Sequence, residues 1–266
     1  MGDPLSGEID NEVAHSARIW NYWLGGKDNY PADRQVGDQI AEMFPGIVST
    51  ALQDRAFLGR AVRFLTEEAG IRQFLDIGTG LPTVDNTHDV AQRVAPETRI
   101  VYVDNDPLVL IHARALLTSS REGATDYIDG DLYDTAGILE KAARTLDFTR
   151  PTAVMLLGIM HFVLDDDRAY SIVRELMAAF PAGSHLAIAH ATGDVDTENS
   201  TKSLAHWNQY GEPKMTFRTI PDIARFFDGL ELVEPGVVSC SRWRPEATVW
   251  GEPEEVNQIC GVARKL

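Results

Sequence analysis

The chain of 266 residues is strongly acidic, with 40 Asp and Glu residues against 24 Lys and Arg residues and a formal charge of −16. Such a surface repels phosphate backbones, and the sequence has no Lys/Arg cluster to offset it, so we expect no nucleic-acid partner. No apolar run approaches the roughly 20 residues of a membrane helix, and the polar residues 1–11 lack the features of a signal peptide. We therefore expect a cytoplasmic protein with no membrane partner.

The first 70 residues are expected to form a helical extension. Apolar residues recur at helical spacing over residues 13–24, 31–43 and 48–69. One interpretation makes residues 13–35 a lid over a ligand site, with Gly25 and Gly26 as its hinge. The alternative is a fixed cap whose aromatic side chains pack on the remainder of the chain. In either case we expect residues 1–70 to belong to the same domain as residues 71–266.

From residue 71 onward the pattern changes to alternating strands and helices. The predicted strands are residues 73–77, 99–103, 124–128, 153–157 and 184–189, and the helices between and after them are 83–94, 107–118, 135–143 and 167–180. This alternation predicts an α/β fold with a mostly parallel sheet and helices on both faces. The last two strands, 230–240 and 258–265, are joined by a loop too short for a crossover helix, so they are expected to pair antiparallel and complete a seven-stranded sheet. Further helices are predicted near 197–209 and over 221–227.

Two of these strands are followed by residues that suit ligand binding. Residues 74–80 read Phe-Leu-Asp-Ile-Gly-Thr-Gly, a buried strand followed by a turn in which Gly78 and Gly80 permit positive φ and close approach of a ligand. The helix start after this turn offers free N–H groups. Residues 100–106 form a second apolar run that ends in acid, and a carboxylate at the position of Asp104 is where doubly wound sheets bind ribose hydroxyls.

These and other segments resemble a known family. The segments that carry the resemblance are residues 17–29, which include Leu-Gly-Gly-Lys-Asp-Asn, and residues 74–83, 101–107, 146–151, 161–166 and 227–233. Together they resemble a bacterial family of class I, Rossmann-like S-adenosyl-L-methionine-dependent methyltransferases formerly of unknown function. The resemblance implies a methyltransferase core over residues 71–266, S-adenosyl-L-methionine as cofactor and a small-molecule acceptor.

The resemblance also implies roles for individual residues. Asp76, Gly78 and Gly80 lie around the methionine part of the cofactor, with Thr79 between the glycines. Asp104 takes the ribose hydroxyls, and the residues expected beside the adenine are Asn105, Asp131 and Leu132. Gly158 and the residues up to His161 line the reacting side. One departure is Leu81-Pro82, where the broader pattern often has a third glycine.

Further candidates come from the extension and from two strand ends. Tyr22, Lys27 and Asn29 are dense in binding groups, and Lys27 is placed to meet the cofactor carboxylate, although an exposed turn is the alternative. His161 and His190 follow the fourth and fifth strands and are the candidate catalytic bases, with a hydrogen bond to a loop as the alternative role for each. No spacing of His, Cys, Asp or Glu matches a metal site.

Two other functions compete with methyl transfer. The alternative is a non-catalytic protein that binds S-adenosylmethionine or a related nucleoside, which nothing in the sequence excludes, because the acceptor side carries no decisive catalytic residue. A nicotinamide dehydrogenase fits less well, since the fourth and fifth residues after Gly78 are Pro82 and Thr83, without the third glycine of Gly-x-Gly-x-x-Gly.

Overall fold

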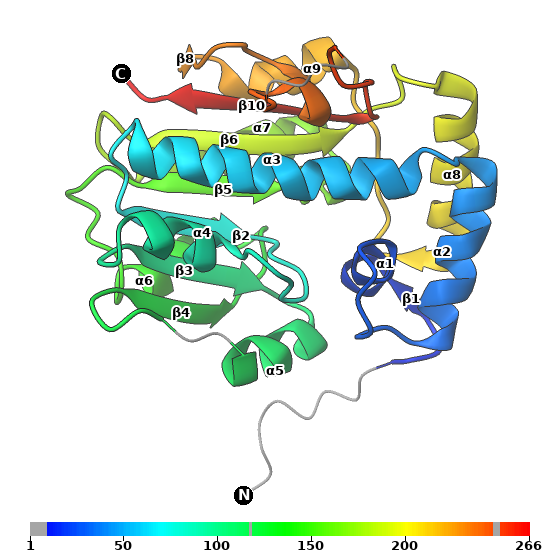
Figure 1. Ribbon diagram of the computed structural model, residues 1–266, viewed down its shortest axis with the longest axis horizontal. Helices are drawn as coiled ribbons and strands as arrows, with labels where there is room; N and C mark the ends of the chain where they lie inside the picture. The colour runs from blue at the N-terminus through cyan, green and yellow to red at the C-terminus, as the bar shows by residue number, and fades with distance from the viewer. Residues whose placement is uncertain (1–9, 117–118, 247–250) are drawn as a thin grey trace, which may run out of the picture.

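A large sheet forms the centre of the molecule (Figure 1) in the computed structural model, which describes residues 10–116, 119–246 and 251–266. Parallel strands stand in the order β4, β3, β2, β5 and β6, and β10 runs antiparallel beside β6. Their bounds are β2 Gln73–Ile77, β3 Arg99–Asp104, β4 Ala124–Asp129, β5 Ala153–Leu157, β6 His185–Ala191 and β10 Gln258–Arg264. The predicted parallel α/β sheet with an antiparallel end is confirmed.

The strand predicted over 230–240 is divided in two. β8 Glu231–Leu232 and β9 Val238–Ser239 each pair antiparallel with β10. A turn separates them, in which the N–H of Gly236 donates to the carbonyl of Val233 at 2.9 Å and Gly236 adopts a φ of +87°. The described part of the chain therefore forms an eight-stranded sheet in place of the seven strands predicted.

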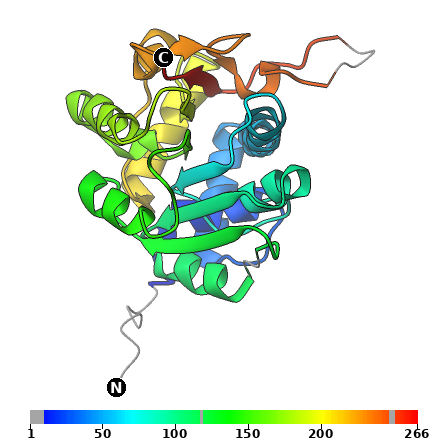
Figure 2. The ribbon, with the colours of Figure 1, turned by 90° about the vertical axis from the view of Figure 1, so that its left-hand side faces the viewer.

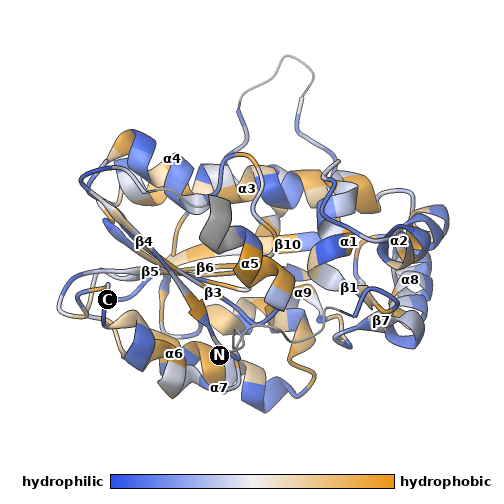
Figure 3. Ribbon diagram, turned by 90° about the horizontal axis from the view of Figure 1, so that it is seen from below, coloured by the Kyte–Doolittle hydropathy of each residue, from blue (hydrophilic) through white to orange (hydrophobic). Residues whose placement is uncertain are grey.

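Helices cover both faces of the sheet (Figures 2 and 3). One face carries α3 Ile47–Glu67 and α4 Thr87–Val94, and the opposite face carries α6 Thr135–Ala142 and α7 Asp166–Ala178. Neighbouring residues of β2 point to opposite faces, so Phe74 packs with Phe57 of α3 while Leu75 packs with Leu176 of α7. This alternation is the strand period of two, and it divides the interior into two apolar cores.

The helix predicted from residue 83 begins four residues later, at Thr87. The carboxylate of Asp89 accepts a hydrogen bond from the N–H of Asn86 at 2.9 Å, and the side chain of Asn86 faces the backbone N–H of Asp89 in return. This reciprocal arrangement is a capping box, which fixes Asn86 as the residue before the first helical turn. Residues 83–86 are therefore free to form part of the loop that follows β2. The helix predicted over 107–118 is α5 Pro107–Leu116, which lies beside the edge strand β4; positions 117 and 118 lie outside the described residues.

Segments far apart in sequence form a cap beyond the carboxyl ends of the parallel strands (Figure 1). The cap comprises residues 14–43 and 197–212, namely β1 Ala14–His15, α1 Ser16–Trp23, α2 Pro31–Met43, α8 Thr197–Tyr210 and β7 Gly211–Glu212. β1 pairs in parallel with β7, and α2 packs against α8. Within the cap, the buried Arg18 Nε lies 3.2 Å from Oδ1 of the fully buried Asp33.

Short helical turns complete the chain. They are η1 Met160–Phe162, α9 Ile220–Ala224, η2 Arg225–Phe227 and η3 Cys240–Arg242. Of these, η1 directly follows β5 and so stands at the same edge of the sheet as the cap. Across the described ranges, no helix combines the length and the apolar character needed to cross a membrane.

Candidate functional site

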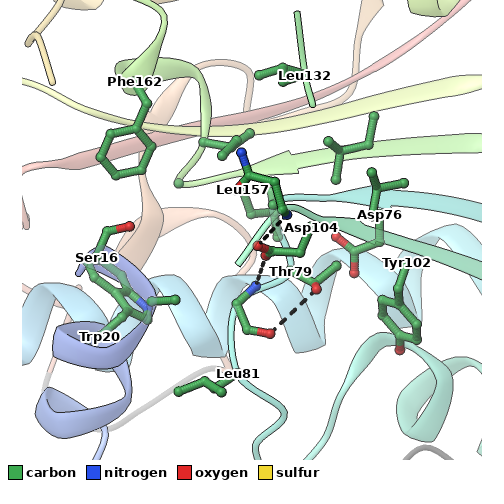
Figure 4. A pocket seen from close by; sticks show the side chains of 18 of the residues that line it. Ser16, Trp20, Asp76, Thr79, Leu81, Tyr102, Asp104, Leu132, Leu157 and Phe162 are labelled. Carbon is green, nitrogen blue, oxygen red and sulfur yellow. Dashed lines mark hydrogen bonds between the residues drawn. The ribbon is translucent and has the colours of Figure 1, made fainter. Parts of the chain in front are cut away.

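A cavity of about 260 Å³ lies between the cap and the carboxyl ends of β2, β3, β4 and β5; we call it the main cavity (Figure 4). Its floor comes from the loops that follow these strands, and its roof comes from α1 with Ser16, Trp20 and Asn21. Parallel strands bring all their carboxyl ends to one edge, which is why residues distant in sequence meet here.

The glycine turn after β2 forms one wall of the main cavity. Gly78 and Gly80 adopt φ values of +76° and +63°, which side chains disfavour. The N–H of Gly78 donates to the carbonyl of Val103 at 2.8 Å, and a Cβ on Gly78 would lie 2.7 Å from the side chain of Ile159. The absence of a side chain at Gly78 therefore lets the loops after β2 and β5 approach each other closely.

Asp104 holds this turn in place. Its Oδ2 accepts a hydrogen bond from the N–H of Gly80 at 2.9 Å (Figure 4), and its Oδ1 accepts from the N–H groups of Asn105 and Asp106. Burial of the carboxyl raises the pKa of Asp104. The structure thus brings together the two motifs on which the sequence analysis depended, while the ribose-binding role of Asp104 stays a prediction.

Acidic and basic side chains from α3 and from the end of β2 line another part of the main cavity; they are Asp54, Arg55 and Asp76. Asp76 at the end of β2 accepts a 2.6 Å hydrogen bond from the hydroxyl of Thr87, and burial raises the pKa of Asp76 to about 6. Asp54 of α3 accepts a hydrogen bond from the amide of Gln258 at 3.3 Å, and burial likewise raises the pKa of Asp54 to about 6. Both carboxylates line the cavity.

Arg55 stands next to these acids. Its Nη2 donates to the carbonyl of Val84 at 2.8 Å, while its buried Nε has no partner in the described part of the chain. The sequence analysis missed both Asp54 and Arg55. A signal was present, since Asp54 falls three residues after Ala51 and three before Phe57 on the buried stripe of α3, where a charge is unexpected.

Two tyrosines that the sequence analysis also missed flank the glycine turn. The hydroxyls of Tyr127 and Thr79 lie 2.7 Å apart, and the ring of Tyr127 stacks on that of Tyr102 at 6.0 Å between centroids. Burial raises the pKa of Tyr127, which therefore keeps its proton. This pair gives the main cavity a flat aromatic wall beside Asp104.

Several predicted cofactor residues lie around the main cavity and three do not. The lining includes Asp76, Gly78, Thr79, Gly80, Asp104, Asn105, Asp131, Leu132 and Gly158. Tyr22, Lys27 and Asn29 lie outside it. The hydroxyl of Tyr22 donates to Asp38, the amide of Asn29 donates to Asn21, and Lys27 is exposed. The reason is the helical period, because α1 turns Trp20, Asn21 and Leu24 toward the cavity and Tyr22 away from it.

The two histidines of the catalytic prediction have different surroundings. His161 in η1 lines the main cavity and is buried; burial, helped by the charge of Arg218, lowers the pKa of His161 to about 3. The Nδ1 of His161 has no partner within the described ranges. His190 lies outside the cavity lining, where its Nδ1 donates to the carbonyl of Ala191 and its Nε2 accepts from Arg218. Because both ring nitrogens of His190 are engaged, it has no free position at which to take a proton.

Arg218 was not anticipated from the sequence. It forms hydrogen bonds to His190 and to the backbone of the turn that carries His161. Its guanidinium is buried and forms an ion pair with Asp166 at 2.9 Å. It also donates to the carbonyls of Met160 and Val163, which fixes the η1 turn that carries His161. In the residues that the structure describes, no group of three or more His, Cys, Asp or Glu side chains could hold a metal ion.

The order of the strands, with an antiparallel strand beside the last parallel one and a ligand-sized cavity at their carboxyl ends, defines a Rossmann-like protein of the class I methyltransferase type. The fold is shared with an O-methyltransferase family protein from Burkholderia thailandensis, at 16% identity and a TM-score of 0.51 over 85% of this chain and 62% of that one.

Sequence comparison then identifies the family. The model of the S-adenosyl methyltransferase family matches residues 3–266, and the chain belongs to that family. A DUF574 family protein from Streptomyces avermitilis MA-4680 is 45% identical, with a TM-score of 0.93 over 97% of this chain and 100% of that one. A provisionally assigned methyltransferase from Thermobifida fusca YX is 39% identical, with a TM-score of 0.88 over 97% of each chain. No curated protein matches the sequence significantly. The protein is thus a methyltransferase that uses S-adenosylmethionine.

Proposed function

We propose that this protein methylates a small-molecule acceptor, with S-adenosylmethionine in the main cavity. The observation that carries the proposal is the contact between the glycine turn and Asp104, which join two strand ends into one site. This arrangement places backbone and carboxylate groups on the same wall of a cavity of about 260 Å³. The small-molecule acceptor follows from the acidic composition, which disfavours a nucleic acid, and from the enclosure of the cavity by the cap.

The charges of the main cavity fit the two ends of the cofactor. Its methionine end carries an ammonium and a carboxylate, and the cavity offers Asp54 and Asp76 to the first and the unpaired Nε of Arg55 to the second. Its nucleoside end requires partners for ribose hydroxyls and a flat base. We assign Asp104 to the hydroxyls, and Asn105, Asp131 and Leu132 to the base. Arg55 replaces Lys27 in this assignment, because Lys27 lies outside the cavity lining.

The residues of this site act by placing the reactants. When bound, S-adenosylmethionine would supply an electrophilic methyl group: the acceptor atom provides the electron pair of the new bond and releases its proton to water, and the sulfur keeps the pair of the broken bond. His161 stays neutral at physiological pH because its pKa is lowered to about 3, so it is a poor general base and a good hydrogen-bonding partner. We therefore assign His161 to orienting the acceptor and give His190 no catalytic role. Positioning alone can supply much of the acceleration of such a displacement.

We further propose that residues 14–43 act as a fixed cap and not as a swinging lid. The buried pair of Arg18 and Asp33 joins α1 to α2 within this segment, and the pairing of β1 with β7 and the packing of α2 on α8 join the segment to residues 197–212. The turn at Gly25 and Gly26 is closed by the side chain of Asn21, which accepts from Asp28 and Asn29. Hydrogen–deuterium exchange tests the assignment. A fixed cap gives similar protection of residues 14–43 with and without S-adenosylhomocysteine, whereas strong ligand-dependent protection contradicts it.

Calorimetry with the purified protein tests the cofactor site. S-adenosylmethionine and S-adenosylhomocysteine are expected to bind, and NAD is not. The variant Arg55→Met is expected to lose affinity for S-adenosylhomocysteine but not for 5′-methylthioadenosine, which lacks the amino acid end. Arg63→Met, on an exposed position of the same helix, is the matched control. Equal losses for both ligands would remove Arg55 from the carboxylate site.

Turnover separates this function from that of a non-catalytic sensor. Incubation with S-adenosylmethionine and a panel of small acceptors is expected to yield S-adenosylhomocysteine in an acceptor-dependent manner. Tight cofactor binding without turnover over a broad panel would favour the sensor.

A further inference from the structure

A second cavity of about 80 Å³ lies between the cap and the carboxyl end of β6; we call it the apolar chamber. It adjoins the main cavity, since Ser16, Trp20, His161 and Phe162 line both. Figure 4 shows Ser16, Trp20 and Phe162 on the same side of the main cavity, opposite Asp76. The junction between the two spaces therefore lies beneath the start of α1.

The wall of the chamber is aromatic and uncharged. Its large side chains include Trp20, Trp23, Phe162, Trp207, Met215 and Phe217. None of the described residues that line it is Asp, Glu, Lys or Arg. The guanidinium of Arg218, which follows the lining residue Phe217 in sequence, donates to His190 and is occupied by Asp166 and two backbone carbonyls. A charged group entering the chamber would lose its hydration without gaining a partner.

Most polar atoms of this wall already have partners. The indole N–H groups of Trp23 and Trp207 donate to the carbonyls of Gly37 and Pro213. The hydroxyl of Thr50 donates to Asn257 at 2.9 Å. Deep in the chamber, a ligand is therefore offered ring faces and hydrocarbon.

The junction differs from this wall. His161 Nδ1 has no partner in the described chain, and Ser16, which carries a hydroxyl, lines both cavities. Free polar groups are thus concentrated where the chamber meets the main cavity. This asymmetry orients a ligand that has one polar end.

We propose that the apolar chamber is the acceptor site, and that the acceptor is an uncharged molecule with an apolar, ring-containing body and one hydroxyl or neutral amine. One ring of the body reaches into the chamber, whose space of about 80 Å³ holds no more, and the rest of the body with the nucleophilic atom lies at the junction at Ser16 and His161, next to the main cavity. This inference rests on the proposed function, because it takes the main cavity as the cofactor site.

Three ligands with the same body test the charge preference. They are 2-naphthol, 2-naphthoate and 2-naphthylmethylammonium, titrated by calorimetry into the full-length protein saturated with S-adenosylhomocysteine. The neutral naphthol is expected to bind at least tenfold more tightly than either ion. Equal or tighter binding of either ion by the unmodified protein overturns the proposal.

A pair of variants on α8 locates the site. Leu204 lines the chamber but not the main cavity, and its neighbour Ala205 is exposed. Leu204→Glu is expected to weaken 2-naphthol at least tenfold and to improve binding of 2-naphthylmethylammonium, a gain that an unfolded variant cannot give. Ala205→Glu adds the same charge outside the chamber and is expected to change neither ligand. Unchanged naphthol binding in Leu204→Glu places the ligand elsewhere and overturns the proposal.

The affinity for S-adenosylhomocysteine keeps the two proposals apart. If it binds while none of the naphthalenes does, the acceptor assignment is wrong and the proposed function stands. If it fails to bind, the cofactor assignment of the main cavity is wrong.

Discussion

The main cavity and the apolar chamber share four lining residues, yet the rest of the main cavity's lining carries charged side chains and that of the chamber does not. The main cavity draws its wall from strand ends and carries buried carboxylates, a guanidinium and a glycine turn. The chamber draws much of its wall from helices of the cap and presents aromatic rings. Between them stands the η1 turn, which Arg218 fixes from behind.

This contrast follows from what each region can supply. Ends of parallel strands expose backbone groups and short polar side chains at fixed positions, which suits a charged ligand of constant structure. Packed helices expose side chains whose size and shape vary freely, which suits an apolar ligand that differs among related proteins. A methyltransferase needs both kinds of wall, and here each comes from a different part of the chain.

The largest expected effect concerns Arg218, which stabilises the η1 turn that lines both cavities. Arg218→Met is expected to lower the free energy of unfolding by about 3–5 kcal/mol, because it leaves the buried carbonyls of Met160 and Val163 and the Nε2 of His190 without a donor, at about 1–3 kcal/mol for each unsatisfied group. Urea denaturation measures this loss. Arg225→Met, with a side chain 56% exposed, is the control and is expected to change stability by about 0.5 kcal/mol or less. Similar losses in both variants would show that Arg218 does not brace the wall.

The second prediction concerns the glycine turn in the wall of the main cavity. Gly78→Ala is expected to cost about 2–4 kcal/mol of stability, since it adds left-handed backbone strain and a clash with Ile159. Gly70→Ala is the matched control, because Gly70 has a φ of +69° and open space around its Cα. It is expected to cost only about 1–2 kcal/mol of strain. Equal losses in urea denaturation would mean that the close approach of Ile159 has no energetic weight.

The third prediction concerns the contribution of one polar group of the main cavity, the Asp104 carboxylate, to cofactor binding. Asp104→Ala is expected to weaken the binding of S-adenosylhomocysteine by at least about 1 kcal/mol, because charge-assisted hydrogen bonds are lost. Asp129→Ala serves as the control, since Asp129 occupies the paired register position on β4 but is exposed and lies outside the cavity lining. Calorimetric affinity that is unchanged in Asp104→Ala would remove this residue from the site.

The smallest expected effect is a difference in pH dependence between the two regions. The pKa values of Asp54 and Asp76 are raised to about 6, and only their ionised forms attract the cofactor ammonium. Affinity for S-adenosylhomocysteine should therefore be nearly full at pH 7, fall as the pH passes through about 6, and drop by about tenfold, or about 1.4 kcal/mol, between pH 7 and pH 5 if one carboxylate dominates. In the chamber, His161 with a pKa lowered to about 3 does not titrate in this range.

Two control ligands sharpen that experiment. Calorimetric titrations of 5′-methylthioadenosine, which has no ammonium, and of 2-naphthol are expected to give constant affinity between pH 7 and pH 5. A parallel decline for all ligands would indicate a general change in the protein and would contradict the assignment to Asp54 and Asp76.

Local sequence determined most of the framework of this protein. The sequence predicted the alternation of strands and helices and the antiparallel end of the sheet, because these depend on short-range periodicity. It also predicted the glycine turn, because that turn depends on backbone freedom at Gly78 and Gly80. Lining positions such as Asp76, Asp131 and Gly158 were implied by the family resemblance, and the structure places them where strand ends meet at one edge. The split strand at Val233–Gly236 and the late start of α4 at Thr87 are local corrections made by a turn and a capping box.

Only the tertiary structure decided which side chains face the ligand spaces. Asp54 and Arg55 enter the main cavity because α3 packs across the sheet, and Tyr22 leaves it because α1 is rotated to present Trp20. Arg218 joins η1, β6 and α7 from more than 20 residues away in sequence, and α8 supplies the chamber with Trp207. Such contacts depend on how separate elements dock, and docking is set by the packing of whole surfaces, which no local pattern encodes.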